Sequence, residues 1–241
     1  MDKHVLVTGG SQGIGRAVVM RLLSDGYHVF NFDLVPPAQT APGEDFSEVD
    51  LVNGAALDAA LSALLTRHPV VRLVNNAGIV RPAPIERATA DDLAAVSALN
   101  LLAPLRLLQG LLPAMRDAGF GRVVNISSRA ALGKLERSAY AATKAGLHGM
   151  TRTWALELGA YGVTVNAVGP GPIATDLFER VNPPGHPNTE KIRNAIPVKR
   201  MGTAEDVAHA VASLIDDRAG FITGQVLYVC GGMTVGLGND V

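Results

Sequence analysis

Cysteine, excess charge and long apolar runs are all scarce in this 241-residue chain. The one cysteine, Cys230, excludes an internal disulfide and fits a reducing compartment. Lys and Arg total 21 and Asp and Glu 22, a net charge of −1, so no positive field is available to hold nucleic acid or an anionic membrane. No apolar run approaches about 18 residues, and the start lacks the pattern of a signal peptide. We therefore expect a cytoplasmic protein with no membrane span.

Metal-binding patterns are missing as well. The six histidines form no H-E-x-x-H pattern and no close pair of the kind that binds metals. The sequence therefore predicts no metal site.

Hydrophobic residues make up 48% of the chain and charged residues 18%, a balance that excludes disorder as the dominant state. One α/β domain can absorb the whole length. Because no linker, repeat or low-complexity tract interrupts the chain, we expect residues 1–241 to form a single domain.

Strand-like and helix-like segments alternate along the chain. Continuous apolar strands between helices indicate a doubly wound parallel sheet of about seven strands with helices on both faces. The expected strands are His4–Thr8, Tyr27–Asp33, Ser47–Leu51, Val70–Asn75, Gly121–Ser127, Val163–Val168 and Gln225–Val229. The expected helices are Ile14–Ser24, Gly54–Arg67, Thr89–Asp117 with a break near Pro104, Ser138–Tyr161 and Ala204–Asp216.

Three stretches depart from this alternation. Pro36–Glu44 is too rich in proline for a connecting helix and is predicted to be a loop. Gly169–Pro172 is predicted to be a rigid turn. Val181–Asn188 is irregular, and we interpret it as a candidate lid within a substrate loop over about residues 176–200.

A glycine-rich loop, Thr8–Gly15 (TGGSQGIG), lies between the first strand and the first helix. Glycines let the backbone approach a ligand closely, and the start of the helix offers N–H groups to a pyrophosphate. Asp33 ends the second strand, which is the expected place for a carboxylate that accepts hydrogen bonds from an adenosine ribose. The loop therefore predicts dinucleotide binding.

Other interpretations of this loop are weaker. A nucleotide-hydrolase phosphate loop needs Gly-Lys-Ser/Thr, but Arg16 and Ala17 follow Gly15. The stretch Gly9–Gly13 also matches the nucleophile elbow G-x-S-x-G of hydrolases, with Ser11 as nucleophile. In that fold the oxyanion hole comes from an upstream loop, and almost no chain precedes this one. A plain tight turn is the third alternative.

Further motifs follow in order along the chain, and together with T-G-x-x-x-G-x-G they resemble the short-chain dehydrogenase/reductase family. The resemblance covers essentially the whole chain, and motifs in register are far more specific than any one of them. The matching positions are Asp50-Leu51, Asn75–Gly78 (NNAG), Asn100, Asn125–Ser128 (NISS), Tyr140 and Lys144 (YxxxK), Pro170-Gly171, Ile173 and Thr175.

The tyrosine and lysine make physical sense without the family. Residues four apart share a helix face, so Tyr140 and Lys144 can act together. A free phenol has a pKa of about 10 and is a poor base at neutral pH. A nearby ammonium favours the phenolate, as would the positive ring of an oxidised nicotinamide.

The resemblance implies a role for each of these residues. Tyr140 would be the general acid/base, Lys144 would lower its pKa and bind the nicotinamide ribose, and Asn100 would hold a water in a proton relay. The implied dinucleotide contacts are Gly9, Ser11, Gln12, Gly13, Ile14, Gly15, Asp33, Asp50, Leu51, Asn76, Ala77, Gly78, Tyr140, Lys144, Pro170, Gly171, Ile173 and Thr175.

The serine that orients the substrate oxygen is one of two neighbours. Family spacing to the tyrosine selects Ser127, whereas the strand motif N-I-S-S selects Ser128. Because a strand fixes geometry more firmly than a loop does, we expect Ser128.

The cofactor is expected to be NAD. Asp33 would repel the 2′-phosphate of NADP, and neither Gln12 nor Leu34 offers a cation to receive it. The resemblance then implies a Rossmann-like fold and hydride transfer between NAD and a secondary alcohol or ketone. Alternatives are a 3-oxoacyl-(acyl-carrier-protein) reductase and, in another class, a non-catalytic dinucleotide sensor. The family also implies a homotetramer or dimer, packed through the helices that carry Asn100 and Tyr140.

Overall fold

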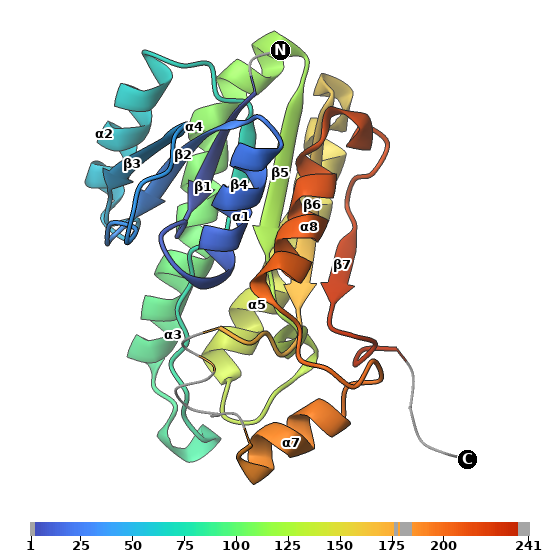
Figure 1. The fold of residues 1–241 in the computed structure, drawn as a ribbon. Coiled ribbons are helices and arrows are strands. Elements are labelled where there is room, and N and C mark those ends of the chain that lie inside the picture. Colours follow the sequence, from blue (N-terminus) through green and yellow to red (C-terminus); the bar gives the residue numbers. More distant parts are fainter. Residues whose placement is uncertain (1–2, 176–177, 179–184, 236–241) are drawn as a thin grey trace.

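Seven parallel strands lie in one sheet, in the order β3-β2-β1-β4-β5-β6-β7 (Figure 1). The structure is a computed structural model that describes residues 3–175, 178 and 185–235. It confirms the predicted α/β fold with a Rossmann-like, doubly wound sheet. The strands are β1 (His4–Thr8), β2 (His28–Asp33), β3 (Glu44–Glu48), β4 (Arg72–Asn75), β5 (Gly121–Ile126), β6 (Val163–Pro170) and β7 (Val226–Val229).

Helices cover both faces of the sheet (Figure 1). On one face α1 (Gly13–Ser24) and α8 (Ala204–Ile215) pack against each other. The other face carries α2 (Gly54–Leu65), α4 (Ala103–Ala118) and α5 (Ser138–Leu158). Two shorter helices, α3 (Ala90–Ser97) and α7 (Pro187–Asn194), lie beyond the carboxyl edge of the sheet (Figure 1).

Strand β1 shows why both faces need cover. Its residues alternate between the two apolar cores, with Val5 and Val7 in the core under α1 and α8 and Leu6 in the opposite core. All three are fully buried. Successive side chains of a strand point to opposite faces, so a parallel strand that is covered twice is apolar throughout.

The strand order reverses between β1 and β4, and the carboxyl ends of all strands meet at one edge (Figure 1). Ligands of open α/β sheets bind in the crevice outside this edge at such a switch point. The glycine loop after β1, the Asn76–Gly78 segment after β4 and Ser128 after β5 are all placed there by the topology.

The third strand was predicted wrongly at Ser47–Leu51, since β3 spans Glu44–Glu48. The Glu44 side chain is buried in an ion pair with Arg16, and β3 accordingly begins at Glu44, three residues before the predicted start. The predicted loop Pro36–Glu44 accordingly ends at Gly43. Asp50 and Leu51 lie beyond the strand, in a turn where Asp50 Oδ1 accepts a 3.0 Å hydrogen bond from the Val52 N–H.

The long helix predicted over Thr89–Asp117 is divided differently from the expectation. A π-helical turn, Ala98–Leu102, separates α3 from α4, and Pro104 lies just after it in the first turn of α4. Proline has no N–H to donate to the carbonyl of Asn100 four residues earlier, so the regular α-helical pattern cannot run through Asn100. The break therefore falls on a residue of the candidate site.

The helical run Ala90–Ala118 is long and apolar enough to cross a membrane by length and composition alone. The expectation of no membrane span rested on uninterrupted apolar runs, whereas this helix contains scattered polar residues. In the fold, α4 packs Leu107, Leu111 and Met115 into the core against the sheet. Core helices of globular domains meet the same length and composition test.

The other predicted strand boundaries differ from the observed ones by one or two residues, and the candidate lid lies partly outside the described residues. The sheet strands β2 and β4 begin one and two residues later than predicted, and β6 runs on to Pro170. Residues 181–184 of the candidate lid and 176–177 and 179–184 of the substrate loop lie outside the described residues. Pro187 and Asn188, predicted as irregular, begin α7.

Candidate active site

The glycine loop after β1 is shaped by two glycines that no other residue could replace easily. Gly13 opens α1 with φ of +53°, a conformation that L side chains rarely adopt. A Cβ on Gly15 would overlap the carbonyl oxygen of Gly9. The sequence therefore needs glycine here for both conformation and space.

Neighbouring strand ends hold this loop in place. On the β2 side, the Gly10 N–H donates to Asn31 Oδ1 at 3.0 Å and the Ser11 N–H donates to Asp33 Oδ2 at 3.0 Å. Asn31 Nδ2 also donates to Ser11 Oγ at 3.2 Å. The Ser11 side chain is thus buried and engaged, which does not suit the nucleophile of an elbow hydrolase.

The β4 side holds the loop equally firmly. Asn76 Nδ2 donates to the carbonyl oxygens of Thr8 and Gly9, both at 2.9 Å. The N–H groups of Asn76 and Ala77 donate to Thr8 Oγ1 at 3.0 and 3.1 Å. The loop is therefore held from the ends of β2 and β4, the two strands on either side of β1.

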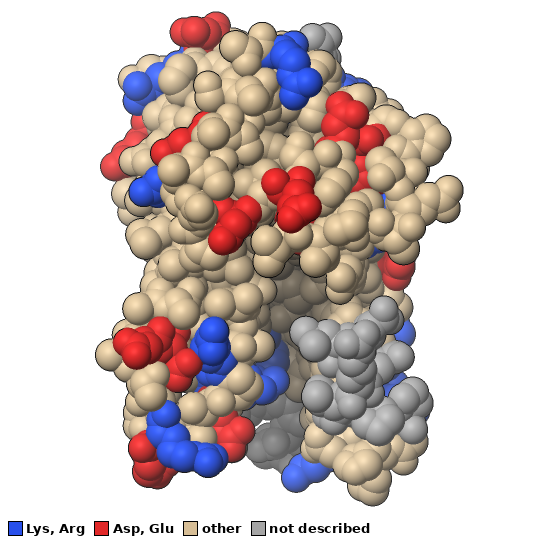
Figure 2. All heavy atoms as spheres, turned by 90° about the vertical axis from the view of Figure 1, so that its left-hand side faces the viewer, with Lys and Arg blue, Asp and Glu red and all other residues tan. Residues whose placement is uncertain are grey.

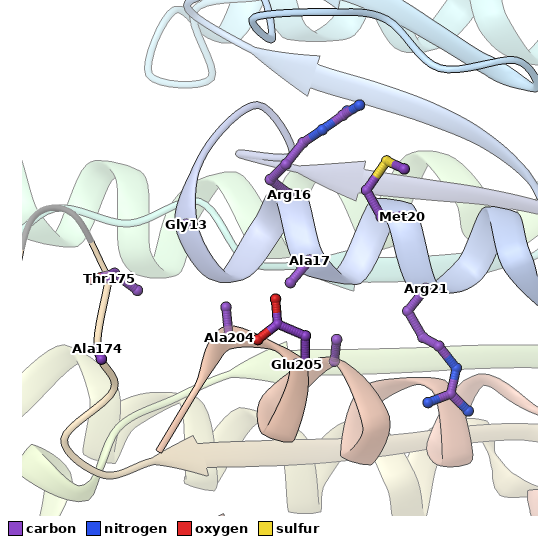
Figure 3. A pocket seen from close by; sticks show the side chains of 10 residues that line it. Gly13, Arg16, Ala17, Met20, Arg21, Ala174, Thr175, Ala204 and Glu205 are labelled. Atoms are coloured by element: carbon purple, nitrogen blue, oxygen red, sulfur yellow. The ribbon is translucent and has the colours of Figure 1, made fainter. Parts of the chain in front are cut away.

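The start of α1 suits an anionic group. Its N-cap residue, Gln12, makes no side-chain capping hydrogen bond, and the first turn contains no acidic residue. A cavity of about 520 Å³ begins at Gly13 and Thr175 and runs between α1 and α8 (Figure 3). Free N–H groups and the positive end of the helix dipole favour a phosphate, so the residues present fit the pyrophosphate of a dinucleotide.

Lys144 lies at the other end of the site and is buried, with 3% of its surface exposed. Its Nζ donates to the carbonyl oxygen of Ile126, the last residue of β5, at 2.7 Å. Burial lowers the pKa of Lys144 to about 8. A Cβ on Gly78 would lie 3.3 Å from Lys144 Nζ and 3.1 Å from Asn100 Oδ1, which places these three residues together.

Tyr140 lies one turn before Lys144, with its ring centroid 5.6 Å from Lys144 Nζ. Burial raises the pKa of Tyr140, while a hydrogen bond with Ser128 and the charge of Arg137 lower it. The net direction is upward, so the phenol is neutral at pH 7.

The two candidate serines face different partners. Ser127 is buried, and its Oγ donates to the carbonyl oxygen of Lys144 at 2.9 Å. Since its one proton is used there, His148 Nε2 is the donor in the 2.7 Å contact with Ser127 Oγ. Ser128 makes the hydrogen bond with Tyr140. Ser128 is thus the serine of the two that acts on the phenol, while the hydroxyl of Ser127 is engaged elsewhere.

The Asn100 amide bonds to protein on both sides. Its Oδ1 accepts from the Ile79 N–H at 3.0 Å, and its Nδ2 donates to the Ile79 carbonyl and to Thr143 Oγ1, both at 3.1 Å. These bonds tie the π-helical turn to the segment after β4 and to α5.

The segment after β6 reaches the glycine loop. The Gly171 N–H donates to the Val229 carbonyl at 2.9 Å, and Ile173 forms a short bridge with Gly202. Thr175 lies near Gly13: its methyl group would be 3.8 Å from a Cβ added to Gly13. Of the predicted residues of this segment, Thr175 therefore lies at the pyrophosphate end of the site.

Several residues that shape the site were not found from the sequence. Asn31 and Glu44 support the glycine loop, but their contacts join different strands and leave no local signal. His148 could have been found, because it lies four residues after Lys144 on the same helix face. Arg137 could also have been found from its place three residues before Tyr140.

Comparison with known proteins gives consistent relatives. The family model described as Enoyl-(Acyl carrier protein) reductase matches residues 9–234. An acetoacetyl-CoA reductase of Rhizobium meliloti is 38% identical over 239 residues, covering 96% of this chain and 98% of that protein. A 3-oxoacyl-[acyl-carrier-protein] reductase of Staphylococcus epidermidis is 35% identical, covering 97% and 99%.

Solved structures agree with these relatives. Levodione reductase superposes with a TM-score of 0.88 at 31% identity and covers 98% of this chain and 99% of its own. A putative NAD(P) dependent gluconate 5-dehydrogenase from Beutenbergia cavernae, with bound NADP, has a TM-score of 0.86 at 32% identity and 96% coverage of both chains.

Gly15→Ala tests the packing of the glycine loop. The added methyl group would overlap the Gly9 carbonyl, so we expect destabilisation by about 1–3 kcal/mol and loss of dinucleotide binding. Chemical denaturation and fluorescence titration with NADH and NADPH measure the two effects. The matched control is Gly149→Ala on α5, where an added Cβ meets nothing within 4 Å. Unchanged stability and binding in Gly15→Ala would contradict the geometry.

Lys144→Met tests the buried ammonium through the pH dependence of stability. The folded pKa of about 8 lies below the unfolded value of about 10.4, so between these pH values the unfolded chain binds more protons and stability rises with pH. From pH 7 to 10 we expect wild type to gain about 2 kcal/mol over Lys144→Met in urea denaturation. Parallel pH curves for the two proteins would refute the shift.

Proposed function

Because the chain belongs to the short-chain dehydrogenase/reductase family, we propose that it transfers hydride between NAD and a secondary alcohol or ketone, with Tyr140 as general acid/base. Family membership makes it an oxidoreductase that acts on ketone or alcohol substrates with a nicotinamide dinucleotide. The coenzyme, the substrate and the roles of single residues belong to the proposal.

One observation carries the assignment of the chemistry. The Tyr140 phenol is hydrogen-bonded to Ser128 and lies above a buried Lys144 ammonium, at the sheet edge where the glycine loop also opens. A phenol, a hydroxyl and a buried cation in one place suit proton transfer to or from a carbonyl oxygen.

Each of these side chains has a distinct task. Ser128 Oγ would hold the substrate oxygen beside the phenol, and Tyr140 would give its proton to that oxygen during reduction. The raised pKa keeps the phenol protonated at neutral pH and therefore ready to act as an acid. Lys144 would bind the nicotinamide ribose, and Asn100, held by Ile79 and Thr143, would support a water in the proton relay. The bound nicotinamide supplies or accepts the hydride.

NAD is favoured over NADP by the charges around β2. Both oxygens of Asp33 accept backbone hydrogen bonds, from Ser11 and Leu34, which fix the carboxylate at the strand end. Arg16 is the cation of α1 that reaches this region, and both Glu44 oxygens hold its Nη1, at 2.8 and 2.7 Å. A 2′-phosphate would face a fixed negative charge and would compete with Glu44 for the arginine.

A 3-oxoacyl-(acyl-carrier-protein) or acyl-CoA reductase is the second candidate. It is favoured by the two curated relatives, at 38% and 35% identity, which carry those names. A non-catalytic sensor is disfavoured because the phenol, the hydroxyl and the ammonium are all in place. A cytoplasmic location and a homotetramer or dimer packed through α4 and α5 stay part of the proposal.

Tyr140→Phe tests the acid/base role. The phenyl ring keeps the packing and removes only the proton carrier, so we expect a loss of kcat of at least about 100-fold with NADH binding unchanged. A panel of secondary alcohols and ketones, followed by NADH absorbance, measures activity. Tyr161→Phe, at a half-exposed tyrosine outside the site, is the control. Near-normal turnover by Tyr140→Phe would exclude the role.

Asp33→Asn tests the choice of coenzyme. Wild type should prefer NADH over NADPH in kcat/KM, and removal of the negative charge should move that ratio toward NADPH by about tenfold or more, about 1.4 kcal/mol. Asp45→Asn, an exposed carboxylate on β3, should leave the ratio unchanged. A wild-type preference for NADPH would overturn the NAD assignment while leaving the oxidoreductase assignment intact.

A further inference from the structure

A strongly basic segment joins the two halves of the proton-transfer site. The nine residues Arg129–Arg137 lead from Ser128 to the start of α5, which carries Tyr140. They contain three basic residues, Arg129, Lys134 and Arg137, and one acidic residue, Glu136. The segment therefore brings a local charge of +2 to a protein whose net charge is −1.

The backbone of this segment is held at both ends. Ser128 Oγ accepts a 3.0 Å hydrogen bond from the Ala130 N–H at its start. At its end, the Glu136 carbonyl accepts a 3.0 Å hydrogen bond from the Ala83 N–H, and Arg137 pairs with Ala83 in a short parallel bridge. The basic side chains therefore extend from fixed positions beside the site.

These three cations are not neutralised by neighbouring carboxylates. None of the ion pairs among the described residues includes Arg129, Lys134 or Arg137. Arg137 Nη1 donates to the Glu136 carbonyl at 3.1 Å, which uses one of its five N–H donors. By contrast, nearby Arg81 faces Asp92 at 3.7 Å.

The charges of these cations act on one another and on the phenol. Burial and the charges of Arg137 and Arg129 lower the pKa of Lys134. The charge of Arg137 lowers the pKa of Tyr140. Like charges held together without a counterion repel each other, and an anion bound among them removes that cost.

The surface near the start of α5 is hollowed. In Figure 2 a hollow opens in the lower half of the face, and both basic and acidic side chains lie beside it. A cavity of about 280 Å³ lies between the start of α5 and the segment after β4, next to Arg137 in the chain, and residues that include Arg81, Asp92 and Ser138 line it.

From this placement we infer that the substrate carries an anionic group, a carboxylate or a phosphate, close to its reacting carbon, and that Arg137 binds it with support from Lys134 and Arg129. The inference rests on the proposed function and names its substrate class. A planar guanidinium pairs with carboxylate or phosphate through two parallel hydrogen bonds, which a lysine cannot do.

The position of Arg137 sets the length of the substrate. Arg137 is the residue just before α5 and precedes Tyr140 by three positions, so we expect an anion bound to it to lie near the carbon that exchanges hydride. The site then suits a short oxo acid or a small ketone phosphate. It does not suit a long thioester whose only charges lie far from the ketone.

Two matched pairs of substrates test the inference. Acetoacetate and methyl acetoacetate share one ketone and differ in charge, as do dihydroxyacetone phosphate and dihydroxyacetone. In at least one of the two pairs, we expect the wild-type kcat/KM for the charged compound to exceed the kcat/KM for the neutral compound by at least about tenfold. The difference should lie mainly in KM. The preferred pair identifies carboxylate or phosphate.

Variants of the segment give the second comparison. Arg137→Gln should abolish the preference for the charged partner, whereas Arg137→Lys should keep part of it. Lys134→Gln should reduce the preference less. Arg116→Gln is the control, because Arg116 lies over the Tyr161 ring at the end of α4. Arg137→Gln should also move the basic limb of the pH profile for the neutral ketone upward, an effect that a structural role would not produce.

The outcomes separate the inference from the proposed function. Equal kcat/KM for charged and neutral partners, or an unchanged preference in Arg137→Gln, overturns the inference and leaves the oxidoreductase assignment standing. If none of the four compounds turns over, calorimetric titration of acetoacetate and dihydroxyacetone phosphate into the NAD-loaded enzyme decides. Binding that Arg137→Gln weakens at least about tenfold supports the inference, and no binding overturns it. Failure of the wider alcohol and ketone panel overturns the proposed function itself.

Discussion

A buried ammonium with one backbone partner fixes the arrangement of this site. Lys144 Nζ donates to the carbonyl of Ile126, which ties α5 to the end of β5. Ser127 Oγ adds a second tie, to the carbonyl of Lys144 itself, and Asn100 Nδ2 adds a third, to Thr143. Burying a charged group costs free energy, and buried charged groups are therefore found mainly at functional sites. The same helix register that buries Lys144 puts the Tyr140 phenol above it.

Much of this arrangement follows from the sequence, because parallel strands end at one edge. Gly9, Asn76 and Ser128 each follow a strand of the sheet. Once those strands are recognised in the sequence, the three residues must lie at the same crevice. Helix spacing then puts Tyr140 and Lys144 on one face. These arguments need only local patterns and a general rule of topology. They do not need any particular side-chain contact.

What the sequence could not predict depends on contacts between distant residues. β3 begins at Glu44 because Arg16 and Asn31, far away in the chain, bury its carboxylate. The choice between Ser127 and Ser128 has the same origin. Neighbouring residues of an extended chain point in opposite directions, and only the packed structure shows that Ser127 turns toward His148 and Ser128 toward Tyr140.

The charges around Tyr140 link substrate recognition to the protonation of the phenol. Burial raises the pKa of Tyr140 and lowers the pKa of Lys144, so both groups are pushed toward their neutral forms. Among the side chains that lower the pKa of Tyr140, Arg137 is the one that carries a charge. An anion bound to Arg137 would offset that charge and let the pKa of Tyr140 rise further. The phenol would then stay protonated to a higher pH when an anionic ketone is bound than when the site is empty.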